Sequence, residues 1–226
     1  MPSLESVLNH PAIWRGNGCA RVAIPSASTG FPELDAVLPG GGWPVAALTE
    51  IYAAHRGIGE MQLLMPAAAR LTRTGRWVTL IAPPYIPYAP ALAAHGLKLS
   101  RLILVRAEKT EERFWACEQA LRYQDCGAVL AWIDHAPERA LKRLQLAAET
   151  GNAIALLFRS ARVIPASPAA LRLQIERSQD RTVVRVLKRR GSGLLTPVAL
   201  DLRDLPTTPT GEPVPAGRPH QLEMVS

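Results

Sequence analysis

Short apolar runs recur along the middle of the chain, at intervals that leave room for a helix between each run and the next. The runs cover residues 46–52, 77–82, 102–106, 128–133 and 153–158. Each run is continuously apolar and does not alternate between apolar and polar positions, which is typical of strands covered on both faces. The pattern therefore predicts buried strands at these places.

The segments between the runs carry the periodicity of helices. The predicted helices cover residues 60–74, 89–95, 111–125 and 137–150. The last is the best marked, because Pro137 stands early in its first turn and Gly151 follows its end. This alternation of strand and helix predicts an α/β fold with a mainly parallel sheet between helices.

The pattern changes after Pro168. The stretch "ALRLQIERSQDRTVVRVLKRRGSGLLTPVALDL" alternates apolar and polar positions between the turn-like "SQD" and "GSG". It predicts antiparallel strands added to one edge of the sheet. From Pro206 the chain is rich in proline and poor in apolar residues, which predicts a disordered tail. The expected division is an N-terminal arm (1–28), a folded domain (29–202) and the tail (203–226).

Length and composition fit one soluble domain. The chain has 226 residues, of which 48% are hydrophobic and 20% charged. No apolar run approaches the ~18 residues of a membrane span, and the first residues do not follow the layout of a signal peptide. We therefore expect a cytoplasmic protein that does not contact a membrane. The cysteines Cys19, Cys117 and Cys126 show no C-x-x-C spacing, which argues against a disulfide framework and a zinc site.

The chain is basic, with a formal charge of +7 and a pI near 9.8. This charge favours an anionic partner, such as nucleic acid or an acidic protein surface. Solubility alone would also account for it. The histidines are scattered singly, and no Ser-His-Asp or paired-carboxylate spacing is present, so the sequence predicts neither a catalytic nor a metal site.

A glycine-containing loop, Ala53-Ala-His-Arg-Gly-Ile-Gly-Glu60, follows the first apolar run. Such a loop before a helix usually binds phosphate through its backbone N–H groups, a Lys and a Ser or Thr. Here the Lys is missing, and Glu60 follows Gly57 and Gly59 at the point where phosphate would bind. We expect the carboxylate to fill the anion site, so that no nucleotide cofactor binds, although Arg56 or Arg70 could replace the lysine. Pro66 predicts either a kinked helix or a helix that begins there.

Several motifs together resemble one family. "STGFPELDAVLPGGGWPVAALTEIY" resembles the entry to a RecA core, and "GIGEMQLLMPA", "GAVLAW" and "LKRLQLAAETG" make the chain most similar to the ImuA family of RecA-like proteins. The resemblance covers residues 14–202. It implies a RecA-like fold with a degenerate Walker A loop.

The resemblance also assigns roles to single residues. Asp134 stands where the family places the Walker B aspartate, although an aspartate that caps the helix at Pro137 is the favoured interpretation. Phe158 and Arg159 stand where RecA proteins carry a nucleotide-sensing glutamine. The segments that follow Asp134 and Ser160, which bind DNA in RecA filaments, are short here.

The ImuA resemblance implies a non-catalytic adaptor in DNA-damage-induced (SOS) translesion synthesis. The implied partners are an ImuB-type polymerase-like protein and the error-prone polymerase III alpha subunit, with RecA as a further partner. Three alternatives stay open: a SulA-like cell-division inhibitor, a residual ATPase and a plain DNA-binding module.

Two surface elements are candidates for contact with DNA or partners. Lys188, Arg189 and Arg190 end a predicted strand, and Arg159 and Arg162 border the short loop that follows residue 158; these cations could contact phosphate, or they could simply be solvated. The final "HQLEMVS" resembles the short peptides by which bacterial polymerases bind the sliding clamp. Leu222 and Met224 would be its apolar anchors, and an apolar chain end without function is the alternative.

Overall fold

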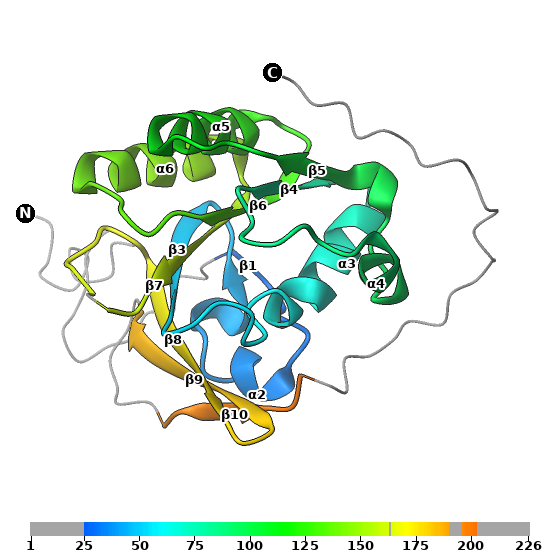
Figure 1. Ribbon diagram of the computed structural model, residues 1–226, viewed down its shortest axis with the longest axis vertical. Coiled ribbons are helices and arrows are strands. Elements are labelled where there is room, and N and C mark those ends of the chain that lie inside the picture. Colours follow the sequence, from blue (N-terminus) through cyan, green and yellow to red (C-terminus); the bar gives the residue numbers. More distant parts are fainter. Residues whose placement is uncertain (1–24, 163, 190–195, 203–226) are drawn as a thin grey trace, which may run out of the picture.

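An eight-stranded sheet forms the centre of the molecule, with helices on both of its faces (Figure 1). The computed structural model describes residues 25–162, 164–189 and 196–202. The strand order is β10-β9-β8-β3-β7-β6-β4-β5. The strands are β3 (Ala47–Ala53), β4 (Trp77–Ile81), β5 (Leu102–Val105), β6 (Cys126–Trp132), β7 (Ile154–Ser160), β8 (Leu171–Ser178), β9 (Arg181–Lys188) and β10 (Val198–Leu200).

The sheet is parallel from β8 to β5 and antiparallel at the other edge. β3 pairs in parallel with both β7 and β8, whereas β9 runs antiparallel to β8 and to β10. The structure thus confirms the predicted α/β class, with a mostly parallel sheet and antiparallel C-terminal strands. The five predicted strands are present as β3 to β7, but β5 is the edge strand and is only partly buried.

Two hydrophobic cores explain why these strands are continuously apolar. Alternate residues of β6 point to opposite faces: Leu130 and Trp132 belong to one core, and Val129 and Ala131 belong to the other. On the first face, α3 (Met65–Arg73) packs against β4 and β6. On the second, α5 (Thr110–Arg122) and α6 (Glu138–Gly151) lie side by side against the sheet (Figure 1). Every residue of β6 is therefore buried, on one face or the other.

Shorter elements complete the fold. β1 (Ser26–Ala27) pairs antiparallel with β2 (Trp43–Pro44), so the last residues assigned to the N-terminal arm contact the folded domain. The remaining short helices are α2 (Pro32–Asp35), η1 (Pro39–Gly41), η2 (Gln62–Leu64), α4 (Ala89–Ala94) and η3 (Leu99–Arg101). No helix in the described ranges has the length and apolar character that crossing a bilayer requires.

The helix predicted over 60–74 is shorter than expected. Residues 62–64 form the 3-10 turn η2, and the α-helix begins at Met65. Pro66 therefore lies in the first turn of α3, where its missing N–H breaks no intrahelical hydrogen bond. The proline starts the helix and does not kink it.

The end of α6 also differs from its prediction. Gly151 is the last residue of the helix, and Asn152 after it takes the left-handed conformation with φ 50°. A Cβ atom on Gly151 would lie 1.7 Å from the Leu121 carbonyl oxygen at the end of α5. The glycine is needed because the two helices approach each other there.

Candidate functional site

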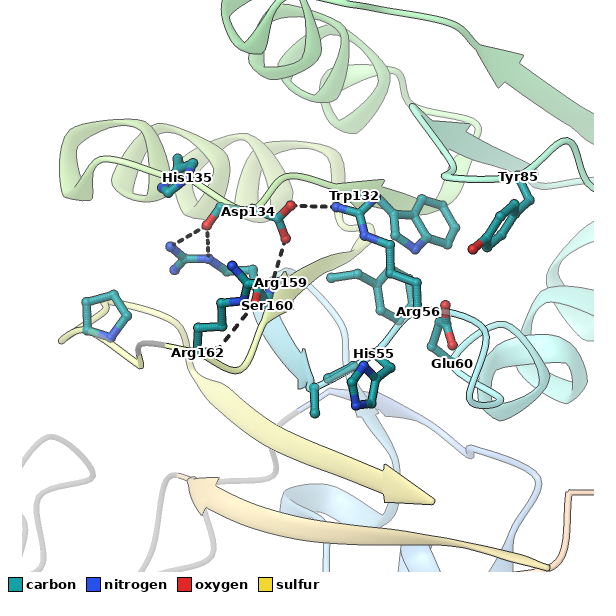
Figure 2. Close-up of a pocket in the computed structure, with 14 residues that line it drawn as sticks. His55, Arg56, Glu60, Tyr85, Trp132, Asp134, His135, Arg159, Ser160 and Arg162 are labelled. Carbon is teal, nitrogen blue, oxygen red and sulfur yellow. Dashed lines mark hydrogen bonds and ion pairs between the residues drawn. The ribbon is translucent and has the colours of Figure 1, made fainter. Parts of the chain in front are cut away.

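A cavity of about 810 Å³ opens at the carboxyl ends of β3, β6 and β7 (Figure 2). In parallel α/β sheets this edge is the usual place for ligands. The sequence-predicted residues Ala53, Glu60, Asp134, Arg159 and Arg162 all line it. The fold therefore brings together residues that are far apart in the sequence.

The glycine loop closes on its own carboxylate. Glu60 Oε1 accepts the Gly57 N–H at 2.8 Å, and Glu60 Oε2 accepts the Ile58 N–H at 2.9 Å. Glu60 is 5% exposed. Backbone N–H groups that would bind a phosphate in a working loop are thus directed at a side chain of the same loop.

Gly59 is required by a close approach. It has φ 106°, and a Cβ there would lie 2.8 Å from Leu202 Cδ1. The hydroxyl of Thr182 on β9 also donates to the Ile58 carbonyl oxygen at 3.3 Å. The loop is therefore packed against the C-terminal strands, which hold it in place.

Asp134 links three segments at the mouth of the cavity. Its Oδ2 forms an ion pair with Arg56 Nη2 at 2.5 Å, and its Oδ1 accepts the Ser160 N–H at 3.0 Å. The expectation that Asp134 caps α6 is wrong, because Pro137 is the N-cap residue and no side chain caps that helix. The side chain is turned toward the end of β7 instead, as Figure 2 shows.

A buried charged cluster underlies the cavity. The Glu50 carboxylate on β3 binds Arg159 Nη1 at 2.6 Å and Arg172 Nε at 3.1 Å. Both arginines also donate to the Tyr52 hydroxyl, from Arg159 Nη1 at 3.3 Å and from Arg172 Nη2 at 2.7 Å. Burial raises the pKa of the Tyr52 phenol above its usual value, although the Arg172 hydrogen bond opposes this shift.

The cluster was not predicted from the sequence. The one sequence feature that indicates it is Glu50, a lone acidic residue inside the apolar run "ALTEIYA". A carboxylate there is fully buried and so requires cationic partners. Nothing in the sequence alone indicates which arginines provide them.

Arg159 is consequently not a surface cation. Its side chain is 5% exposed, and its Nε and Nη2 donate to the Asp134 carbonyl oxygen at 3.3 and 3.2 Å. The expectation that Arg159 adds to a surface field for DNA is corrected by this burial. Arg162, in contrast, is exposed at the rim of the cavity.

The basic residues at the end of β9 contact neighbouring backbone. Lys188 Nζ donates to the Ser167 carbonyl oxygen, and Arg189 Nη1 donates to the Val37 carbonyl oxygen, both at 2.9 Å. In the register of β8 and β9, Lys188 lies opposite Arg172 at the start of β8, away from the carboxyl ends where the cavity opens. Arg190, Leu222 and Met224 lie outside the described residues.

The chemistry open to the cavity is limited by these contacts. Both carboxylates that line it, Glu60 and Asp134, are already hydrogen bonded, and the glycine loop contains no lysine. Within the described part of the chain, no group of three His, Cys, Asp or Glu residues could hold a metal ion. The loop geometry is that of an anion site that carries an internal anion.

These features define an α/β domain with a glycine loop of the phosphate-binding type that is closed by a glutamate. The family model described as cell division inhibitor SulA matches residues 47–155. Protein ImuA of Caulobacter vibrioides is 33% identical over 136 residues, which cover 57% of this chain and 55% of that protein. The chain thus spans about half the length of the ImuA relatives that it matches.

Two cell division inhibitors named SulA are similar over comparable stretches. The protein of Pseudomonas aeruginosa is 29% identical over 164 residues, covering 70% of this chain and 95% of the relative. The protein of Edwardsiella piscicida is 32% identical over 114 residues, covering 47% of this chain and 67% of the relative. The chain belongs to the ImuA/SulA-related family.

Proposed function

We propose that the protein is a non-catalytic RecA-like adaptor in the SOS response to DNA damage, acting in translesion synthesis. The observation that carries the proposal is the Glu60 carboxylate, which occupies the N–H groups of Gly57 and Ile58. A nucleotide phosphate would have to displace this carboxylate, and the loop contains no lysine that would then bind the phosphate. The similarity to ImuA supplies the biological setting.

The remaining polar groups support a structural role for this edge of the sheet. Asp134 is paired with Arg56 and bonded to Ser160, so its carboxylate serves to join the ends of β6 and β7. A general base needs a carboxylate within reach of a substrate proton. In this cavity the carboxylates of Glu60 and Asp134 are instead bonded to groups of the protein itself.

The proposed partners are those of the ImuA resemblance: an ImuB-type polymerase-like protein, the error-prone polymerase III alpha subunit and RecA. Weak contacts with DNA, through the basic residues, and with the sliding clamp, through Leu222 and Met224, are further proposals. The protein would act in the cytoplasm, at the nucleoid, after DNA damage.

Calorimetric titration with ATP and Mg²⁺ tests the non-catalytic part, and we expect no measurable heat of binding. A micromolar dissociation constant for ATP would contradict the proposal that the protein is non-catalytic.

Co-expression with the polymerase-like subunit and size-exclusion chromatography tests the adaptor part, and we expect the two proteins to co-elute. Separate elution at micromolar concentrations would remove the adaptor proposal.

A SulA-like inhibitor of cell division is the second candidate. It is favoured by the Pseudomonas aeruginosa relative, of which the chain covers 95%. The strands β8 to β10 favour the ImuA-like role, because they close the sheet with Leu173, Val184 and Leu200 in the core and their sequence resembles the closing antiparallel strands of a RecA core. Induced expression in a bacterial host separates the two, since an inhibitor makes cells filamentous and an adaptor leaves cell length unchanged.

A further inference from the structure

One stretch of the sequence, between Glu60 and Glu108, carries positive charge and no acidic residue. No Asp or Glu occurs between Glu60 and Glu108, whereas six cations do: Arg70, Arg73, Arg76, Lys98, Arg101 and Arg106. These cations account for most of the formal charge of +7. The stretch forms α3, β4, α4, η3 and β5; β5 is the edge strand of the sheet, β4 is its neighbour, and α3 and α4 lie near this end of the sheet in Figure 1.

Three of these cations, Arg76, Lys98 and Arg101, contact neutral groups. Arg76 Nη2 donates to the Cys126 carbonyl oxygen at 2.5 Å, and Lys98 Nζ donates to the Arg73 carbonyl oxygen at 3.4 Å. The Arg101 guanidinium lies over the Trp77 ring, 5.0 Å from its centroid. Asp35 is an acid near this stretch, where its charge acts on Arg70.

Large apolar side chains are exposed in the loop between β4 and α4, within the same stretch. Tyr85, Ile86 and Tyr88 are 69%, 73% and 72% exposed, and they lie within four consecutive residues in which only Pro87 intervenes. Folded monomers rarely leave such side chains together in water unless the patch binds something. The neighbouring prolines restrict this loop, which lowers the entropy lost when a partner binds.

A groove of about 330 Å³ runs beside this loop. Its apolar lining includes Met61, Met65, Leu92 and Trp132. Among the described residues that line it there is no Lys or Arg, and Glu60 is engaged in its own loop. The groove therefore suits aliphatic or aromatic side chains, whereas the cations lie beyond it on α3 and η3.

We propose that this groove and the Tyr85–Ile86–Tyr88 loop bind an acidic segment of a partner protein, one that carries apolar anchors between its acidic residues. The anchors would fill the groove while the acidic side chains meet Lys98 and Arg101. A nucleic acid fits less well, because its phosphates would need cations along the groove itself. The inference rests on the proposed adaptor function and names the surface that the function uses.

Selection of a random peptide library on the full-length protein tests the proposal. We expect the selected peptides to combine Asp or Glu with aliphatic or aromatic residues. Binding of a selected peptide, followed by fluorescence anisotropy, should weaken at least about tenfold in the triple variant Tyr85→Ala, Ile86→Ala, Tyr88→Ala. It should weaken several-fold at low salt in the variant Lys98→Glu, Arg101→Glu, since the charges steer and hold the acidic residues.

The control is the variant Tyr123→Ala, Leu146→Ala, which removes side chains 54% and 60% exposed on the α5 and α6 side. Its peptide affinity should equal that of the unchanged protein, and thermal unfolding would verify that every variant is folded. Failure to enrich acidic peptides, or equal affinity in the triple variant, would overturn the proposal. So would binding of single-stranded poly-dT that is lost in the triple variant while no peptide binds.

Co-elution with the polymerase-like subunit separates this surface from the adaptor function. If the triple variant still co-elutes with that subunit, the adaptor function stands and the groove is not the surface it uses. If even the unchanged protein fails to co-elute while the peptide result holds, the groove stands and the named partner is wrong. Loss of co-elution in the triple variant alone supports both.

Discussion

Glu50 and Arg159 form an ion pair of 2.6 Å between side chains that are 0% and 5% exposed. Arg172 binds the other oxygen of the same carboxylate, so one buried anion holds β7 and β8 to the central strand β3. Taking charges out of water is costly, and such a cluster persists only when every member is bonded. It therefore fixes how the strands under the cavity are arranged.

The first prediction concerns this cluster. Glu50→Gln keeps the shape of the side chain but leaves two guanidinium groups buried without a counter-charge. We expect the free energy of unfolding to fall by about 3–5 kcal/mol, the range found when one partner of a buried ion pair is removed. Urea denaturation followed by circular dichroism would measure it.

The matched control is the exposed pair between Glu138 and Lys142 on α6, whose side chains are 66% and 62% exposed. Lys142→Ala should change the free energy of unfolding by about 0.5 kcal/mol or less. A Glu50→Gln variant as stable as this control would show that the cluster contributes nothing to stability.

The second prediction concerns the closed glycine loop. Glu60→Ala removes the acceptor of two backbone N–H groups, which should cost about 1.5–3 kcal/mol of stability. It should also open an anion site, so that sulfate raises the unfolding temperature of the variant more than that of the unchanged protein. Calorimetric unfolding across a sulfate series would show this difference.

Glu60→Gln is the control for the second prediction. Its amide oxygen can still accept one of the two N–H groups, so we expect a smaller loss of stability and little response to sulfate. If sulfate stabilises all three proteins equally, the loop does not bind anions after the carboxylate is removed.

Continuous apolar runs were enough to predict the central strands, because these strands are covered on both faces of the sheet and consist mostly of apolar residues. In β6, for example, every residue from Cys126 to Trp132 is buried. The start of α3 was less well predicted, since Glu60 and Met61 fit a helical pattern equally well. The bonds from Gly57 and Ile58 to the Glu60 side chain, which no periodicity reveals, set the loop geometry before the helix.

The candidate site was partly predictable for a related reason. Glu60 could be placed because its partners are two and three residues away in the sequence. Asp134 and Arg159 were misjudged because their partners are distant: Arg56 precedes Asp134 by 78 positions, and Glu50 precedes Arg159 by 109. Only the sheet order brings these residues together.

The third prediction concerns the two buried thiols. Burial raises the pKa of Cys117 to about 12 and that of Cys126 to about 11. At pH 8 the thiolate fractions are then on the order of 10⁻⁴ and 10⁻³, and the thiolate is the reactive form. In a Cys19→Ser variant we expect almost no reaction with a disulfide reagent until urea unfolds the protein.

The same shifts set the direction of the pH dependence. Above pH 9.0, the ordinary value for these thiols, the unfolded chain releases their protons while the folded chain retains them. The unfolded state then binds fewer protons, so stability falls as pH rises toward 11 and 12. Replacing both cysteines by Ala should flatten this decline, and an equally steep decline would assign it to other groups.

The last prediction concerns the basic end of β9. Lys188 and Arg189 donate to the carbonyl oxygens of Ser167 and Val37, contacts that orient both side chains. If the protein binds DNA through this end, each cation that meets a phosphate adds about one to the slope of log affinity against log salt. Changing Lys188, Arg189 and Arg190 to Ala should therefore lower the slope by up to about three and weaken all DNA sequences alike. The control is Lys109→Ala, Lys142→Ala, which removes exposed cations on α6 and before α5. An unchanged slope in the triple variant, or an equal loss in the control, would mean that these residues are solvated cations without a role in DNA binding.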